Sequence, residues 1–172
     1  LRSMEWDLDR TTYDRQGYDD YIVGSAEVVG LMCLHVFVFG KRDRYEALLG
    51  HARSLGAAFQ KVNFLRDLKD DFEEKGRVYF PGVDMTQFNA EVKDQIEDEI
   101  AEDFRDAYKG IVKLPKESRL GVYVAYVYYL RLFQKISALP SNRIMEERIR
   151  IPNRRKATLF LSSYLRHSFN LL

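Results

Sequence analysis

The stretch that decides the fold lies at residues 56–81 and reads GAAFQKVNFLRDLKDDFEEKGRVYFP. On a helix with about 100° per residue, one set of small, amide and carboxylate residues falls within an arc of about 80°. This set consists of Gly56, Gln60, Asn63, Asp67 and Asp71. Apolar side chains occupy most of the remaining circumference. The pattern therefore predicts a helix whose narrow polar stripe faces an internal polar cavity.

Two carboxylates of this stripe have the spacing of a metal site. Asp67 and Asp71 are four residues apart on the helix, so both can bind one hard cation from the same side. Magnesium typically takes one or two protein carboxylates, and substrate phosphates supply further oxygens. Asn63 and Gln60 add neutral oxygens or amide donors one and two turns earlier.

The neighbours of this acidic pair distinguish it from others in the chain. Arg66 and Arg77 are placed to meet phosphate oxygens. Acidic pairs with the same spacing also occur within residues 94–106, where they are typical of an ordinary solvated helix face. The residues around the Asp67–Asp71 pair, and not the spacing of the pair, therefore favour a metal and phosphate site.

The rest of the chain also predicts helices, and we expect an all-α protein with a single domain over residues 1–172. A polar lead-in over 1–17 precedes a helix that Asp19 or Asp20 caps and Gly40 ends. The next helix covers 43–75, with a break expected near Gly50 or Gly56. Three further helices are expected: one from Asp84 or Thr86 to Tyr108, one from Ser118 to the region of Pro140, and one over 153–169.

Composition excludes several classes of protein. The 27 Lys and Arg residues nearly balance the 26 Asp and Glu residues, which argues against a nucleic-acid partner. One cysteine and three scattered histidines give neither a disulfide framework nor a zinc site, and favour the cytoplasm. The apolar run at 28–39 is shorter than the roughly 20 residues of a membrane span, so we expect a buried helix there.

Three stretches carry a resemblance to a known family. Residues 59–81 resemble the second aspartate-rich motif of the squalene and phytoene synthase family. SMEWDLDRTTY and YIVGSAEVVGLM resemble the segment that enters the family's central helix, and RIRIPNRRKATL resembles its basic C-terminal signature. The wording is most like bacterial phytoene synthases. The resemblance implies an isoprenoid-synthase helical bundle, of which this chain would be the C-terminal part without the N-terminal helices.

The resemblance implies a reaction and its cofactor. The family condenses two prenyl diphosphates head to head with Mg²⁺, and geranylgeranyl or farnesyl diphosphate would be the substrate. Phytoene is the first expected product, and squalene or dehydrosqualene is the second. The family uses two aspartate-rich motifs, and only one is found here, so we expect the chain alone to be inactive.

The resemblance also implies roles for individual residues. The implied catalytic residues are Asp67, Asp71, Tyr129 and Arg148, and the implied metal ligands are Asp67, Asp71 and Asn63. The residues implied beside the diphosphate are Gln60, Asn63, Arg77 and Tyr79. The residues implied to line the prenyl channel are Ser25, Val29, Gly30, Gly56 and Phe59.

Two other functions stay open from the residues themselves. One is a non-catalytic family member that acts as a binding or assembly protein. The other is a helical interaction domain with an acidic face over residues 91–106. Self-association is expected where missing helices leave apolar surface bare. The basic group at 148–156 either closes over diphosphates, contacts acidic membrane lipid or is solvated surface, so peripheral membrane contact joins the cytoplasm as an expected location.

Overall fold

The computed structural model describes residues 2–146, 148–169 and 171. The helices, in chain order, are α1 Arg2–Asp9, α2 Arg15–Ile22, the π-helical turn η1 Val23–Glu27, α3 Val28–Phe37, α4 Arg42–Arg66, α5 Leu68–Lys75, the 3₁₀ turn η2 Met85–Gln87, α6 Ala90–Ile111, α7 Lys116–Ser137, α8 Ser141–Ile144 and α9 Asn153–Ser168. The described residues form no β-strand, and an isolated bridge joins Thr12 to Val78. The all-α prediction is confirmed.

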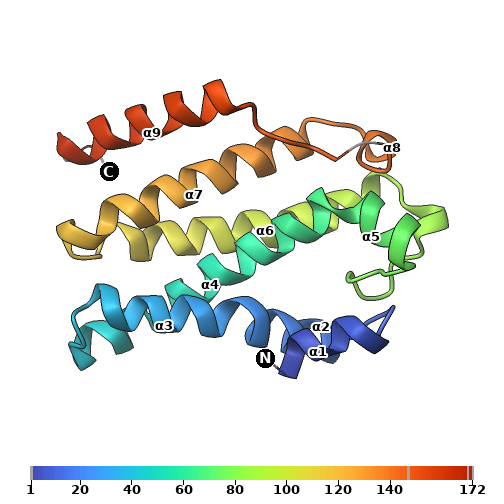
Figure 1. Cartoon of the computed structure of the whole chain (residues 1–172), viewed down its shortest axis with the longest axis horizontal. Coiled ribbons are helices and arrows are strands. Elements are labelled where there is room, and N and C mark those ends of the chain that lie inside the picture. The colour runs from blue at the N-terminus through green and yellow to red at the C-terminus, as the bar shows by residue number, and fades with distance from the viewer. Residues whose placement is uncertain (1, 147, 170, 172) are drawn as a thin grey trace.

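Helix α4 occupies the centre of the bundle (Figure 1). It packs on α6 and α7 on one side and on η1 and α3 on the other, and α9 lies along the outer side of α7. The main apolar core, which includes Ala58, Val62 and Leu65 of α4, lies between these helices. A second, smaller apolar cluster closes the far end of the bundle with Leu34, Val38, Leu48 and Leu114.

Two glycines allow the main chains of α3 and α4 to approach closely. A Cβ atom on Gly56 would lie 2.9 Å from the carbonyl oxygen of Ala26. A Cβ atom on Gly30 would lie 2.9 Å from the carbonyl oxygen of Ala52. Because real Cβ atoms are not found this close to main-chain atoms, any larger residue at either position must push the two helices apart.

Several helix ends differ from the sequence-based expectation. The expected lead-in contains α1, and Asp14, rather than Asp19 or Asp20, caps α2 by accepting the Gly17 N–H at 2.7 Å. Helices α2, η1 and α3 then run on without a break over residues 15–37. Phe39 (φ 57°) and Gly40 (φ 67°) take left-handed backbone conformations, which ends the run as predicted.

The expected break in α4 is also in a different place. The helix continues through Gly50 and Gly56 and ends at Arg66, and Gly56 packs closely against η1. Asp67, with φ −97° and ψ 7°, separates it from α5, which Gly76 ends as predicted.

Two further helix starts also differ from the prediction, at α6 and at α7. Asp84 caps only η2, whereas Asn89 caps α6 by accepting the Val92 N–H at 3.0 Å. Helix α7 begins at Lys116 directly after Pro115, and the Ser118 hydroxyl donates to the carbonyl of Phe37 at 3.1 Å. The short helix α8 was not predicted, and α9 confirms the predicted last helix.

The expectation that residues 28–39 form a buried helix is wrong. Among the residues of α3, only Leu34 is buried, and Val29, Met32 and Val36 are 53%, 67% and 68% exposed. The uninterrupted helical run Arg15–Phe37 is long and apolar enough to cross a membrane by length and composition, a test that core helices of soluble proteins also pass. Sequence reasoning missed this because it counted the apolar run and not the helix that contains it.

We expect Gly56→Ala to lower the free energy of unfolding by about 1–3 kcal/mol, because the added methyl group meets immobile main-chain atoms of η1. Gly50→Ala is the matched control, since a Cβ atom there meets nothing within 4 Å. The control should raise the free energy of unfolding by up to about 1 kcal/mol through helix propensity. Urea unfolding followed by circular dichroism measures both variants. Equal effects of the two substitutions would contradict the close approach of the helices.

Candidate active site

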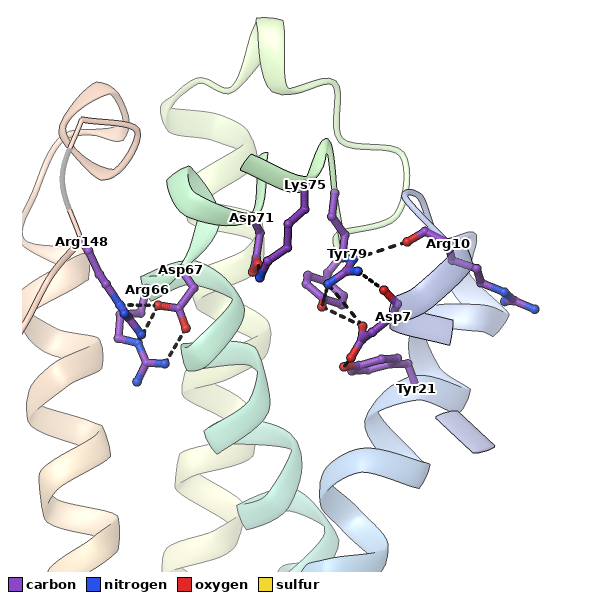
Figure 2. A network of polar contacts seen from close by, with 10 residues as sticks. Asp7, Arg10, Tyr21, Arg66, Asp67, Asp71, Lys75, Tyr79 and Arg148 are labelled. Atoms are coloured by element: carbon purple, nitrogen blue, oxygen red, sulfur yellow. Dashed lines mark hydrogen bonds and ion pairs between the residues drawn. The ribbon is translucent and has the colours of Figure 1, made fainter. Parts of the chain in front are cut away.

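The predicted acidic pair lies where α4 passes into α5 (Figure 2). The Asp67 N–H donates to the carbonyl of Asn63 at 2.9 Å, and the Asp71 N–H donates to the carbonyl of Asp67 at 2.9 Å. The one-turn register therefore continues across the break at Asp67. The sequence placed these residues on one uninterrupted helix, and the structure keeps their spacing while turning the chain between them.

Two arginines hold the Asp67 carboxylate. Arg66 Nη2 lies 2.5 Å from Asp67 Oδ2, and Arg148 Nε lies 2.6 Å from Asp67 Oδ1. The hydrogen bond to Asp67 raises the pKa of the Arg66 guanidinium. The structure thus brings Arg148, from the segment before α9, onto the acidic pair (Figure 2).

Asp71 is buried and has a different cation. Its Oδ1 accepts a hydrogen bond from Lys75 Nζ at 2.8 Å, on the next turn of α5. Its main-chain carbonyl accepts the Arg77 N–H at 2.8 Å, which anchors the strand-like segment that follows Gly76. Asp67 and Asp71 therefore each face a basic side chain, and together these groups form a charged end of the bundle.

Arg77 and Tyr79 are bonded to Asp7 of α1. The Tyr79 hydroxyl donates to Asp7 Oδ1 at 3.1 Å, and Arg77 Nη1 lies 3.5 Å from the same oxygen. The Arg77 guanidinium also donates to the main-chain carbonyls of Asp7 and Arg10. Asp7 thus fixes the two residues that the resemblance places beside the diphosphate.

Sequence reasoning missed two residues of this group, Asp7 and Tyr21. The Tyr21 hydroxyl donates to Asp7 Oδ2 at 2.9 Å. Burial, together with the hydrogen bond to Asp7, raises the pKa of Tyr21, and burial raises the pKa of Tyr79 to about 12. Both phenols therefore stay protonated at neutral pH. Asp7 lies inside the quoted stretch SMEWDLDRTTY, but nothing in its spacing indicated a contact with residues 77–79.

Asn63 carries a buried oxygen without a partner. Its side-chain Oδ1 accepts no hydrogen bond in the structure, although it is shielded from solvent. A buried amide oxygen in a folded protein almost always has a donor or a cation beside it. Because Asn63 lies one turn before Asp67, its free oxygen is suited to a ligand at the acidic pair.

Oxygen donors suited to magnesium are present at this end of the bundle. The described residues contain no cluster of three or more His, Cys, Asp or Glu side chains that could hold a metal by themselves. The two carboxylates with the Asn63 oxygen instead match a Mg²⁺ ion that phosphate oxygens and water complete. These residues fit the ion only together with an anionic ligand.

A cavity of about 400 Å³ lies between α3, α4, α6 and α7, and its lining on α4 ends at Gln60, three residues before Asn63. Its walls include every residue that the sequence assigned to a prenyl channel, together with Gln60: Ser25, Val29, Gly30, Gly56, Phe59 and Gln60. The remaining walls are mostly apolar. The expected polar cavity is therefore wrong, because Gly56 and Gln60 line a mainly apolar cavity and the rest of the stripe, from Asn63 to Asp71, lies outside its lining.

Tyr129 connects the cavity to the charged end. Its ring stacks on Phe59 with centroids 4.0 Å apart and planes 18° apart. Phe59 lines the cavity, and the Tyr129 hydroxyl lies close enough to interact electrostatically with Arg66. Tyr129 therefore stands between the apolar cavity and the arginines that hold Asp67. On the cavity side, the Ser25 hydroxyl donates to the carbonyl of Tyr21 at 2.6 Å.

Comparison with known proteins shows which fold this is. The structure superimposes on a crystal structure titled "dehydrosqualene synthase in complex with ligand" with a TM-score of 0.73 and 21% sequence identity. The match covers 96% of this chain and 62% of that chain. The fold is that of the all-α isoprenoid synthases.

A family model described as squalene/phytoene synthase matches residues 1–155. Chloroplastic phytoene synthase 1 of Arabidopsis thaliana is 28% identical over 158 residues, which are 80% of this chain and 37% of the relative. The 4,4′-diapophytoene synthase of Staphylococcus haemolyticus is 32% identical over 91 residues, which are 52% of this chain and 30% of the relative. The 15-cis-phytoene synthase of Synechocystis is 29% identical over 130 residues, which are 67% and 38% of the two chains.

The chain belongs to the squalene/phytoene synthase family. It spans less than half the length of these curated relatives.

We expect Asp7→Asn to lower the free energy of unfolding by about 1–3 kcal/mol, because the buried Arg77 guanidinium and two phenols lose a charged acceptor. Asp9→Asn, on the same helix and exposed, is the control and should change stability little. Urea unfolding measures both. If the two variants unfold alike, Asp7 is not the anchor of residues 77–79.

Proposed function

We propose that this chain is the C-terminal part of a magnesium-dependent prenyl transferase that condenses two prenyl diphosphates head to head. Phytoene is the first candidate product, and squalene or dehydrosqualene is the second. One observation carries the proposal: the helix that leads to the carboxylate pair and the unpartnered amide oxygen of Asn63 also lines an apolar cavity of about 400 Å³, from Leu48 to Gln60. A diphosphate with a long hydrocarbon tail has this combination of a highly charged end and an apolar body.

The charged end would bind the diphosphate. When held by Asp67, Asp71 and Asn63, Mg²⁺ would stabilise the negative charge that builds on the leaving diphosphate. Arg66 and Arg148 now neutralise Asp67, and both are free to donate to phosphate oxygens if that carboxylate binds a metal instead. The same arginines would therefore pair with Asp67 when no metal is bound and with the diphosphate when a metal is bound.

The apolar walls would protect the reacting carbons. In this reaction the C–O bond of one substrate breaks, its electron pair leaves on the diphosphate, and the double bond of the second substrate attacks the allylic carbon. Phe59, which lines the cavity and stacks on Tyr129, would offer an aromatic face to a carbocation. The apolar cavity excludes water, which would otherwise trap that cation.

The complete reaction needs more than this chain. The residues before Asp67 carry no second DxxxD motif, and the match to the Arabidopsis relative covers only 37% of that relative. We therefore propose that the chain binds a prenyl diphosphate but does not turn it over alone.

Two surfaces support proposals about partners and location. The end of the chain, α9 included, exposes apolar side chains (Phe160, Leu161, Tyr164, Leu165 and Phe169) beside three exposed cations (Arg154, Arg155 and Lys156). We propose peripheral contact with acidic lipid there for an otherwise cytoplasmic protein. The exposed face of α3 supports self-association.

We expect Asp67→Asn/Asp71→Asn to weaken Mg²⁺-dependent binding of a non-hydrolysable twenty-carbon thiolodiphosphate at least about tenfold, or about 1.4 kcal/mol. Calorimetric titration with and without Mg²⁺ measures it. Asp94→Asn/Asp98→Asn, with the same spacing on the exposed face of α6, is the control and should not change affinity. Binding by the folded chain that ignores both Mg²⁺ and the double substitution would favour a non-catalytic binding protein.

Arg148→Ala should weaken the same diphosphate about tenfold, because one charge-assisted donor is lost. The affinity for the corresponding prenyl alcohol should stay unchanged, since the alcohol lacks the phosphates. Arg150→Ala is the matched control on the exposed neighbouring side chain. An equal loss of alcohol and diphosphate binding would show that Arg148 supports the fold and not the diphosphate.

A further inference from the structure

One face of α4 carries both the acidic end and a wall of the cavity. The cavity-lining residues of this helix are Leu48, His51, Ala52, Leu55, Gly56, Phe59 and Gln60. Asn63 and Asp67 continue the same face at spacings of three and four residues. The cavity therefore runs along α4 away from the charged end. A residue of α4 with a lower number lies farther from Asp67 and so deeper in the cavity.

His51 is the one ionisable side chain of α4 in this wall. Its Nδ1 lies 2.9 Å from Asp106 Oδ2, which also accepts the Ser54 hydroxyl at 2.9 Å. The hydrogen bond from His51 lowers the pKa of Asp106, so the carboxylate is ionised at neutral pH and Nδ1 must be the donor. These hydrogen bonds fix the His51 ring beside Asp106 of α6.

Gly110 of α6 lies against the His51 side chain. A Cβ atom on Gly110 would lie 2.3 Å from the Cβ atom of His51. The histidine side chain therefore occupies the space that a side chain on α6 would take. The hydrogen bond to Asp106 and the close approach to Gly110 both tie the His51 side chain to α6.

The depth of His51 matches a particular tail length. At 1.5 Å per residue, His51 lies about 24 Å along α4 from Asp67. An extended isoprene unit has four main-chain carbons and is about 5 Å long, so fifteen- and twenty-carbon tails measure about 15 and 20 Å. Adding about 4 Å for the bound phosphate, the twenty-carbon tail ends beside His51 and the fifteen-carbon tail ends one turn short, near Leu55.

The cavity lining continues past His51 to Leu48 and Leu114. The small apolar cluster of Leu34, Val38, Leu48 and Leu114 fills the bundle there, and three of these residues line the cavity floor. A tail longer than twenty carbons would have to displace this cluster or the histidine.

We propose that His51, held by Asp106, determines which tail length the cavity accepts. The inference rests on the proposed function, because it takes the diphosphate to lie at Asp67 and Asp71. His51 is a specificity-determining residue that contacts the end of a twenty-carbon tail and leaves a fifteen-carbon tail untouched.

Cys33, the single cysteine of the sequence, reports occupancy at this depth. It lines the cavity and is exposed. The Gly56–Ala26 and Gly30–Ala52 approaches show that the η1–α3 run and α4 are antiparallel, so Cys33, three residues deeper than Gly30, lies level with Leu49, about 3 Å beyond His51. The rate at which a small thiol reagent alkylates Cys33 therefore measures whether a tail reaches His51.

The test compares the wild-type chain with His51→Trp, in the presence of fifteen- or twenty-carbon thiolodiphosphates and Mg²⁺. In the wild type, the longer ligand should slow alkylation of Cys33 about fivefold and the shorter one less than about twofold. In His51→Trp, protection by the longer ligand should disappear, while calorimetric affinity for the shorter ligand stays within about threefold. His35→Trp is the matched control, since His35 is exposed on α3 outside the cavity lining.

A second variant, His51→Ala, covers the case in which tryptophan prevents folding. It should retain protection by the twenty-carbon ligand and add protection by a twenty-five-carbon ligand. Unchanged protection in both variants, or equal loss of both ligands in a folded variant, would overturn the proposal.

The corresponding prenyl alcohols separate this inference from the proposed function. If the diphosphates do not bind but the twenty-carbon alcohol protects Cys33 in the wild type and not in His51→Trp, the transferase proposal fails and the role of His51 stands. If neither alcohol nor diphosphate protects Cys33 in the wild type, both proposals are wrong.

Discussion

The main-chain contact between α4 and the run formed by η1 and α3 supports the rest of the structure. At Gly56 and Gly30, a carbonyl oxygen of the facing helix lies so close that it leaves no room for a Cβ atom. This contact fixes the position of α4, and α4 carries both the cavity wall and the residues that lead to Asp67. A shift of one helix against the other would change the cavity and the charged end together.

At the charged end, the acidic side chains are paired with basic side chains of the protein. Asp67 lies between two arginines, Asp71 bonds Lys75, and Asp7 holds Arg77. Each carboxylate is thereby neutralised in the absence of a ligand, which avoids the cost of a buried unpaired charge. Asn63 Oδ1 is the exception, since it has no donor. Its free oxygen supports the proposed ligand at this end of the bundle.

Polar groups along the cavity are few, and two of them are held by neighbours. Ser25 donates to the main chain of its own helix, and His51 bonds Asp106. Hydrogen-bonded polar groups are less able to retain water, so the cavity stays suited to a hydrocarbon tail despite them. The outer face of α3 and the exposed apolar residues of α9 show the same apolar character on the surface.

The sequence by itself determined the helical class and the spacing of Asp67 and Asp71 with Asn63 and Gln60, because these depend on periodicity along the chain. Only the tertiary structure decided that the break falls at Asp67, that Arg148 reaches it, and that Asp7 binds Arg77 and Tyr79. Such contacts join segments far apart in the chain, where local periodicity carries no information. For the same reason the buried helix expected at residues 28–39 is exposed: hydrophobicity predicts that a side chain avoids water, and packing partners decide whether it can.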